Sequence, residues 1–150
     1  MSEIISSGDF LAVMNETFLS GGVVRFTPSG SSMIPLLNGT SDTVTLSNKP
    51  PILRKYDVIF YRRADDSLVL HRIVGCEKDG TYTLCGDNQL DFEKGVRYED
   101  VLALMTAYSK NGKERTTSSF SYKLYSRTLL FRKKCHIALS KAYHAIFRKK

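Results

Sequence analysis

Short β-prone runs separated by turn residues fill the middle of the chain, and this pattern constrains the fold more than any other. Runs of β-branched, aromatic and aliphatic residues are bounded by Gly, Pro, Asn, Asp or Ser every ten residues or so. The predicted strands cover residues 23–28, 43–46, 58–61, 68–74, 81–84 and 101–107. Many short strands with such turns are typical of an all-β barrel or sandwich. The sequence therefore predicts a mainly β fold.

A short helix is predicted before the first strand. Residues 10–19 follow the capping signal Ser7-Gly8-Asp9 and end at Gly21-Gly22. Helical spacing places one set of apolar side chains on a common face: Phe10, Val13, Met14 and Phe18. We expect this face to pack on the β region as a lid.

The C-terminal part of the chain is basic and helical in pattern. The chain carries +7 overall, but residues 120–150 hold nine Lys or Arg and no acid, so residues 1–119 carry about −2. Apolar and small residues recur at steps of four and three: Leu124, Thr128, Phe131, Cys135, Ala138, Ala142 and Ala145. This spacing predicts a basic amphipathic helix. The expected organisation is a β domain over 1–110, a polar linker over 111–119 and a helical tail over 120–150.

The tail has two competing interpretations. Its apolar face can pack on the β domain, or the helix can lie at an anionic membrane surface with its basic residues on the headgroups. Binding to nucleic acid ranks third, because the helix offers few aromatic side chains besides Tyr125 and Tyr143. Neither a signal peptide nor a run of about 20 apolar residues is visible. We expect a cytoplasmic protein, with peripheral membrane contact through the tail as the alternative.

Three segments carry residues suited to nucleophilic catalysis. The turn 29–35, Ser-Gly-Ser-Ser-Met-Ile-Pro, follows the first predicted strand and lifts a hydroxyl out of the sheet. Serine is a weak nucleophile without a base, and His71 lies inside the predicted strand 68–74. Asp87 and Asp91 lie in a turn after the next strand and supply carboxylates that could orient the base. Each segment alone also fits a purely structural role, as a turn or a core residue.

In this order, the three segments resemble the motifs of the signal peptidase and LexA-type serine peptidase clan. Gly30-x-Ser32-Met33-x-Pro35 resembles the nucleophile motif, whose Ser stands before Met. His71-Arg72-Ile73-Val74-Gly75 resembles the base motif, in which bacterial signal peptidases have Lys and the endoplasmic-reticulum type has His. Gly86-Asp87-Asn88, with Asp91 behind it, resembles the acidic motif. The resemblance covers roughly residues 21–107 and implies a signal peptidase/LexA-like β fold.

The resemblance implies a role for each residue of the nucleophile motif. Ser32 would attack a peptide carbonyl, and Met33 would anchor the turn by packing. Signal peptidases usually read Ser-Gly-Ser-Met, so this turn is one residue longer, and Gly30 stands where some of them place an oxyanion hydroxyl. The backbone N–H of Ser32, with the hydroxyl of Ser29 or Ser31, would then hold the oxyanion.

For the base, the resemblance implies that His71 takes the Ser32 proton and that Asp87 or Asp91 fixes its tautomer, a choice that stays open. We expect the imidazole to titrate near its ordinary pKa. No metal or cofactor motif is present, and Cys76, Cys85 and Cys135 have no metal-ligand spacing.

Three functions follow as hypotheses. The first is a serine endopeptidase that cleaves a peptide or leader segment, with a peptide or protein substrate as its partner and no specific nucleic acid. The second is a LexA-like self-cleaving regulator without a DNA-binding domain, which the 31 residues before Ser32 disfavour because they are too few for that domain and a linker. The third is a non-catalytic β domain that binds an anionic surface.

Overall fold

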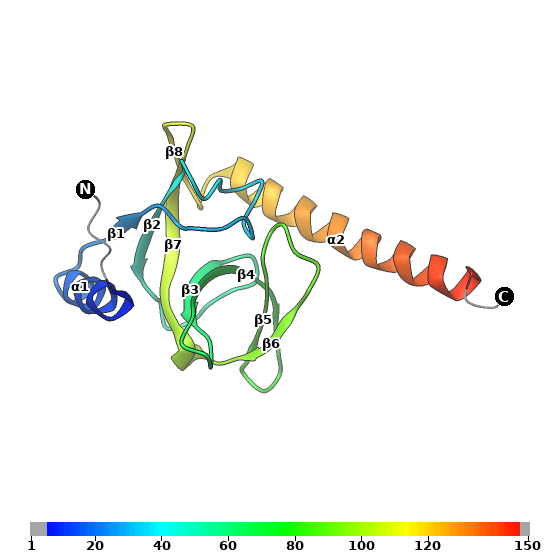
Figure 1. Ribbon diagram of the computed structural model, residues 1–150, viewed down its shortest axis with the longest axis horizontal. Coiled ribbons are helices and arrows are strands. Elements are labelled where there is room, and N and C mark those ends of the chain that lie inside the picture. Colours follow the sequence, from blue (N-terminus) through cyan, green and yellow to red (C-terminus); the bar gives the residue numbers. More distant parts are fainter. Residues whose placement is uncertain (1–5, 148–150) are drawn as a thin grey trace.

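The structure is a computed structural model that describes residues 6–147, and it is mainly antiparallel β-sheet with a helix near each end (Figure 1). The mainly β prediction is confirmed. The helices are α1 (Ser7–Leu19) and α2 (Phe120–Phe147). The strands are β1 (Val24–Phe26), β2 (Thr43–Asn48), β3 (Val58–Arg62), β4 (Leu68–Cys76), β5 (Tyr82–Cys85), β6 (Glu93–Val96), β7 (Val101–Lys110) and β8 (Lys113–Thr116).

The strands form one open sheet. The hydrogen-bonded order is β1-β2-β7-β3-β4-β5-β6, with β8 paired to β7, and every pair is antiparallel. β1 and β6 end this path within the described residues, so the sheet is not closed by hydrogen bonds as the expected barrel would be. Register shifts interrupt four of the pairings, β2–β7, β3–β7, β4–β5 and β5–β6. Such irregularities increase the local twist, and Figure 1 shows the sheet curling around its centre.

Two strands lie where no strand was predicted. β6 reads Glu-Lys-Gly-Val and β8 reads Lys-Glu-Arg-Thr, and β8 falls within the segment expected to be a linker. Both are short, β8 is exposed throughout, β6 buries only Val96, and each pairs with a single neighbour within the described residues. Strands of this kind need no apolar alternation, since neither face covers much of the core.

The core divides into two clusters along the sheet. The larger cluster joins the sheet to α1, to the turn at residues 29–35 (the serine turn) and to the start of α2. Its buried members include Met14, Met33, Leu37, Leu46, Phe60, Met105 and Tyr122. The smaller cluster lies around β3, β4 and β5 and includes Ile59, Tyr61, Ile73, Leu84 and Val101. The serine turn is thus anchored by side chains of the main core.

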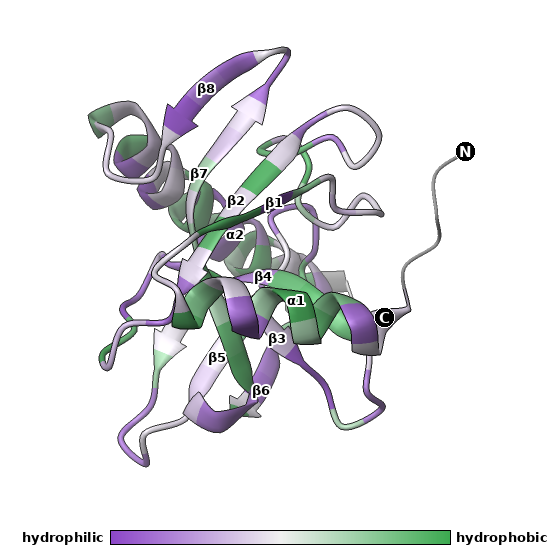
Figure 2. Ribbon diagram, turned by 90° about the vertical axis from the view of Figure 1, so that its left-hand side faces the viewer, coloured by the Kyte–Doolittle hydropathy of each residue, from purple (hydrophilic) through white to green (hydrophobic). Residues whose placement is uncertain are grey.

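α1 forms where the capping signal predicted a helix. The Ser6 hydroxyl accepts a hydrogen bond from the Asp9 backbone N–H at 3.1 Å. Met14 is buried, and the ring of Phe10 meets those of Phe26 and Phe60 edge-on, whereas Val13 of the predicted face is 58% exposed. Figure 2 shows α1 lying across the sheet, with its hydrophobic residues interrupted by polar ones. The predicted lid is therefore present but narrower than the pattern indicated.

α2 packs on the body through a stripe that the sequence did not predict. Its buried side chains are Tyr122, Ser126, Leu130 and Lys133, while Leu124, Phe131, Cys135 and Ala138 of the predicted packing face are exposed. The interpretation in which that face packs on the β domain is therefore wrong. The later turns of α2 project away from the sheet (Figure 1), and residues 148–150 of the expected tail lie outside the described residues. No described helix is long and apolar enough to cross a membrane.

Candidate active site

The turn after β1 holds Ser32 in a fixed, half-buried position. Gly30 has a φ of +92°, which favours glycine, and a Cβ on Gly39 would collide with the Gly30 carbonyl. Met33 and Leu37 are buried beneath the turn, and the Leu37 N–H donates to the Met33 carbonyl at 3.0 Å. Local backbone geometry and core packing therefore both fix the segment that carries the candidate nucleophile.

The Gly-Asp-Asn turn after β5 supports the backbone of Ser32 directly. The Asn88 N–H donates to the Ser32 carbonyl at 2.8 Å, and the Asn88 side-chain amide donates to the Ser31 carbonyl at 3.3 Å. A Cβ on Gly86 would lie 2.7 Å from the same Ser32 carbonyl oxygen, so only glycine allows this approach. The Gly-Asp-Asn turn therefore supports the serine turn through these hydrogen bonds.

The Asp87 carboxylate is engaged away from His71. Arg72 donates to it through Nε at 2.8 Å and Nη2 at 2.7 Å, and the Tyr125 hydroxyl donates at 3.0 Å. The side chains of Arg72 and Asp87 are 0% and 1% exposed. Within the described residues Asp87 makes no hydrogen bond to His71, and Asp91 is exposed and makes none either. The orienting role of either Asp stays a prediction, and these contacts favour other residues for it.

Side chains of α2 also hold the Gly-Asp-Asn turn in place. Arg72 Nη1 donates to the Tyr122 hydroxyl at 3.0 Å and to Ser126 Oγ at 2.8 Å. The buried Lys133 ammonium donates to the Gly86 carbonyl at 2.7 Å and to the Gln89 carbonyl. The turn that supports Ser32 is therefore held on one side by a buried ion pair and on the other by a lysine of α2.

His71 lies in β4 and is 3% exposed. Its Nδ1 lies 3.3 Å from the Tyr61 hydroxyl, which donates to Glu93 Oε2 at 2.6 Å. Arg63 binds the same carboxylate at 2.7 Å. Although burial raises the pKa of Glu93, the hydrogen bonds from Arg63 and Tyr61 leave it below its ordinary value. Glu93 is therefore a carboxylate that can only accept.

The Tyr61–Glu93 contact fixes the tautomer of His71. The single hydroxyl proton of Tyr61 is used toward Glu93, so the Tyr61 oxygen can only accept from His71 Nδ1–H. A neutral imidazole that donates from Nδ1 carries its lone pair on Nε2. Nε2 makes no hydrogen bond, and no buried side-chain nitrogen or oxygen in the described chain lacks one, so Nε2 is open to the pocket.

Burial, followed by the positive charge of Arg63, lowers the pKa of His71 to about 4. The charges of Glu93 and Asp87 act in the opposite direction but are weaker. The prediction that His71 keeps its ordinary pKa is therefore wrong. The imidazole is neutral at every pH above about 4, which is the state a general base requires.

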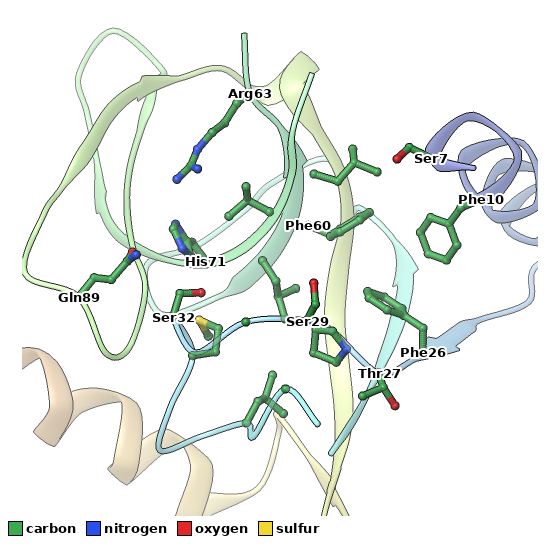
Figure 3. Close-up of a pocket in the computed structure, with 18 residues that line it drawn as sticks. Ser7, Phe10, Phe26, Thr27, Ser29, Ser32, Phe60, Arg63, His71 and Gln89 are labelled. Carbon is green, nitrogen blue, oxygen red and sulfur yellow. The ribbon is translucent and has the colours of Figure 1, made fainter. Parts of the chain in front are cut away.

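Ser32 and His71 line the same pocket, whose volume is about 500 Å³. Figure 3 shows both side chains at one end of the pocket with Gln89, and Phe10, Phe26 and Phe60 at the other end. The remaining lining residues are Ser7, Thr27, Pro28, Ser29, Gly30, Met33, Leu37, Gly39, Arg63, Leu68, Val69 and Leu70. The pocket thus combines a polar end, where chemistry could occur, with an aromatic end.

The two predicted oxyanion hydroxyls differ in position. Both serines are exposed, but Ser29 lines the pocket and Ser31 does not. Neither the backbone N–H of Ser32 nor its hydroxyl makes a hydrogen bond within the described chain, and the hydroxyl is not buried, so it is available to a substrate. Ser29 therefore fits the oxyanion role better than Ser31.

Tyr61, Glu93 and Lys133 were not predicted as site residues from the sequence. Tyr61 is two residues from Ile59, which pairs with His71, so strand alternation could have placed Tyr61 on the face of His71. Glu93 gave no signal because it lies in the unpredicted β6.

The described residues contain no group of three His, Cys, Asp or Glu that could hold a metal ion, and Cys76, Cys85 and Cys135 are free thiols. The candidate centre therefore consists of a serine, a histidine and their supports. Its residues come from the three motifs, from β3 and β6, which supply Tyr61 and Glu93, and from α2. Comparison with protein-family models, curated proteins and solved structures finds no match for this chain.

Proposed function

We propose that the protein is a serine endopeptidase of the signal peptidase/LexA-like type, with Ser32 as nucleophile and His71 as general base. One observation carries the proposal: two motifs 39 positions apart line one pocket, and the histidine offers it an unpaired Nε2. A serine that shares a pocket with a neutral imidazole whose other nitrogen is held by a third group has the partners that activate a serine hydroxyl once substrate brings the two side chains into hydrogen-bond contact.

The chemistry follows from this arrangement. Ser32 Oγ attacks the peptide carbonyl carbon while His71 Nε2 takes its proton, and the Ser32 N–H and the Ser29 hydroxyl hold the oxyanion. The imidazolium then protonates the leaving amine, which leaves an acyl-enzyme that water hydrolyses by the same steps. The Nδ1–H···Tyr61···Glu93 chain keeps the ring oriented throughout, and the charge of Glu93 favours the imidazolium as it forms.

The proposed substrate is an extended segment of a peptide or protein. The pocket is bordered by Phe26 of β1 and by residues 68–70 of β4, and the outer edge of β1 has no strand partner within the described residues. Extended peptides bind such edges by adding a strand, and side chains then enter neighbouring pockets. The aromatic end formed by Phe10, Phe26 and Phe60 would accept an apolar side chain.

A fluorophosphonate probe tests the proposal, since it reacts with activated serines. The adduct is located by peptide mass spectrometry on the wild type and on Ser32→Ala, Ser31→Ala and His71→Gln. We expect a single adduct at Ser32, lost in Ser32→Ala and His71→Gln and kept in Ser31→Ala. A folded wild-type protein that takes up no probe would support the non-catalytic β domain instead. Labelling that survives Ser32→Ala would show that another serine is the nucleophile.

A further inference from the structure

α2 has an inward face and an outward face. The buried side chains Tyr122, Ser126, Leu130 and Lys133 follow one another at steps of four, four and three, so they form one stripe toward the body. This stripe uses the tyrosine, the serine and the lysine that hold the candidate site. Docking on the body therefore leaves the remaining faces of α2 uncovered.

Large apolar side chains lie on the outward face. Leu124 is 51%, Phe131 70% and Ile146 69% exposed, and Phe120 and Leu139 are exposed as well. At about 100° per residue, these positions centre on the side of the helix opposite the buried stripe. Exposed apolar residues that recur on one helix face indicate a surface that is covered in the working protein.

Cations flank the outward face. Lys123, Arg127, Lys134 and Lys141 recur at steps of four and seven along one border, and Arg132 lies on the other. All five are exposed, and α2 contains no Asp or Glu. Residues 1–119 carry about −2, and α2 holds six of the nine Lys and Arg of residues 120–150, so most of the positive charge belongs to this helix. The complementary surface must therefore be both apolar and anionic.

We propose that the outward face of α2 binds the surface of an anionic lipid bilayer, with the helix in the plane of the interface and the β body on its far side. The apolar side chains enter the boundary between headgroups and acyl chains, and the flanking Lys and Arg contact lipid phosphates. Nucleic acid would use the charge but would leave Phe131, Leu139 and Ile146 without a role. A bilayer uses both features.

Vesicle co-sedimentation of the full chain tests the proposal. We expect binding to vesicles of phosphatidylcholine with phosphatidylglycerol, little binding to phosphatidylcholine alone, and weaker binding as salt is raised. A protein that stays in the supernatant with anionic vesicles at low salt overturns the proposal. This result says nothing about Ser32 labelling, so the two proposals fail separately.

Matched variants identify the face. Phe131→Ser with Leu139→Ser should weaken vesicle binding by at least about tenfold, because apolar burial is lost. Lys134→Glu with Lys141→Glu should weaken it about fivefold or more for each charge. Ile52→Ser and Lys94→Glu alter equally exposed residues of the body and should leave binding unchanged.

Two outcomes of these variants contradict the proposal. Binding that depends on the lysines but not on Phe131 and Leu139 would show attraction by charge alone. Binding to an RNA oligonucleotide that is tighter than binding to vesicles, and unaffected by the apolar substitutions, would assign the face to nucleic acid. Circular dichroism of each variant confirms that α2 is retained.

Discussion

The two sides of the candidate site are built in different ways. His71 is held by Tyr61 and by the Arg63–Glu93 pair, whose side chains are 36% and 31% exposed. Ser32 is braced by a turn whose Asp87 forms a fully buried pair with Arg72. Partly exposed ion pairs contribute about 0–1 kcal/mol to stability, whereas breaking a buried pair costs about 3–5 kcal/mol.

The two acidic residues therefore contribute to different properties: Glu93 to the state of His71 and Asp87 to the stability of the fold. Glu93 can act on His71 through Tyr61 without carrying much of the fold, and Asp87 can carry the fold without contacting His71. An acidic motif next to a candidate catalytic histidine is therefore not by itself evidence of an orienting acid. Changes on the histidine side should alter rate, and changes on the serine side should alter stability.

The largest effect is expected for Tyr61→Phe on reaction rate. The substitution removes the oxygen that accepts from His71 Nδ1, and loss of tautomer control costs up to about 10⁴-fold in known triads. We expect a fall of about 10²- to 10⁴-fold in the fluorophosphonate labelling rate. Tyr98→Phe, which removes a 2.9 Å hydrogen bond to the Pro50 carbonyl far from the pocket, is the control. Unchanged labelling of Tyr61→Phe would remove Tyr61 and Glu93 from the mechanism.

Asp87→Asn should act on folding. It leaves the Arg72 guanidinium buried without a counter-charge, which should lower the free energy of unfolding by about 3–5 kcal/mol. Urea denaturation measures this loss, and Asp91→Asn, an exposed carboxylate, should change it by less than about 0.5 kcal/mol. An Asp87→Asn protein with wild-type stability and strongly reduced labelling would make Asp87 the orienting acid after all.

His71 should make stability depend on pH. Its pKa in the folded protein, about 4, lies below its ordinary value of 6.5, so the unfolded chain binds a proton first as the pH falls. The contribution to stability is complete above about pH 6.5 and is lost toward about pH 4, by about 3 kcal/mol. His71→Gln should remove this part of the pH dependence. Parallel stability curves for the two proteins between pH 7 and pH 4 would show that burial does not hold the imidazole neutral.

The smallest effect is expected for Lys133→Met. The substitution removes the charged donor of the Gly86 and Gln89 carbonyls, which keep only the Gln89 N–H and the Cys85 thiol as donors, at a cost of about 1–3 kcal/mol in unfolding free energy. Labelling of Ser32 should slow as well, because the same turn supports its backbone. The neighbouring Lys134 is exposed, so Lys134→Met should keep the stability and the labelling rate of the wild type. Equal stability of the two variants would mean that α2 does not hold the turn.

The sequence predicted the parts of the molecule that local patterns determine. The six strands with apolar runs and the capped helix at residues 10–19 are present with small changes of boundary. The turn that presents Ser32 was also predicted, because a glycine and three serines at residues 29–32, directly after a strand, are typical of a turn. Ser32 and His71, chosen from motifs alone, line one pocket.

The parts that depend on long-range contacts could not be predicted. β6 and β8 are polar edge strands with no periodic signal, so Glu93 was missed with them. The inward face of α2 was misassigned because Lys133 and Ser126 look like surface residues in the sequence. They are buried because Lys133 meets backbone carbonyls and Ser126 meets Arg72, partners 47 and 54 positions away.

The proposed chemistry requires His71 to present an unprotonated Nε2 to Ser32 while Nδ1 donates to Tyr61. Nitrogen-15 NMR of histidine-labelled protein measures this directly, with His71→Gln assigning the ring among the three histidines. We predict a neutral ring with the proton on Nδ1 and no titration until the pH falls to about 4. A ring with the proton on Nε2, or one that titrates near 6.5, would contradict this prediction.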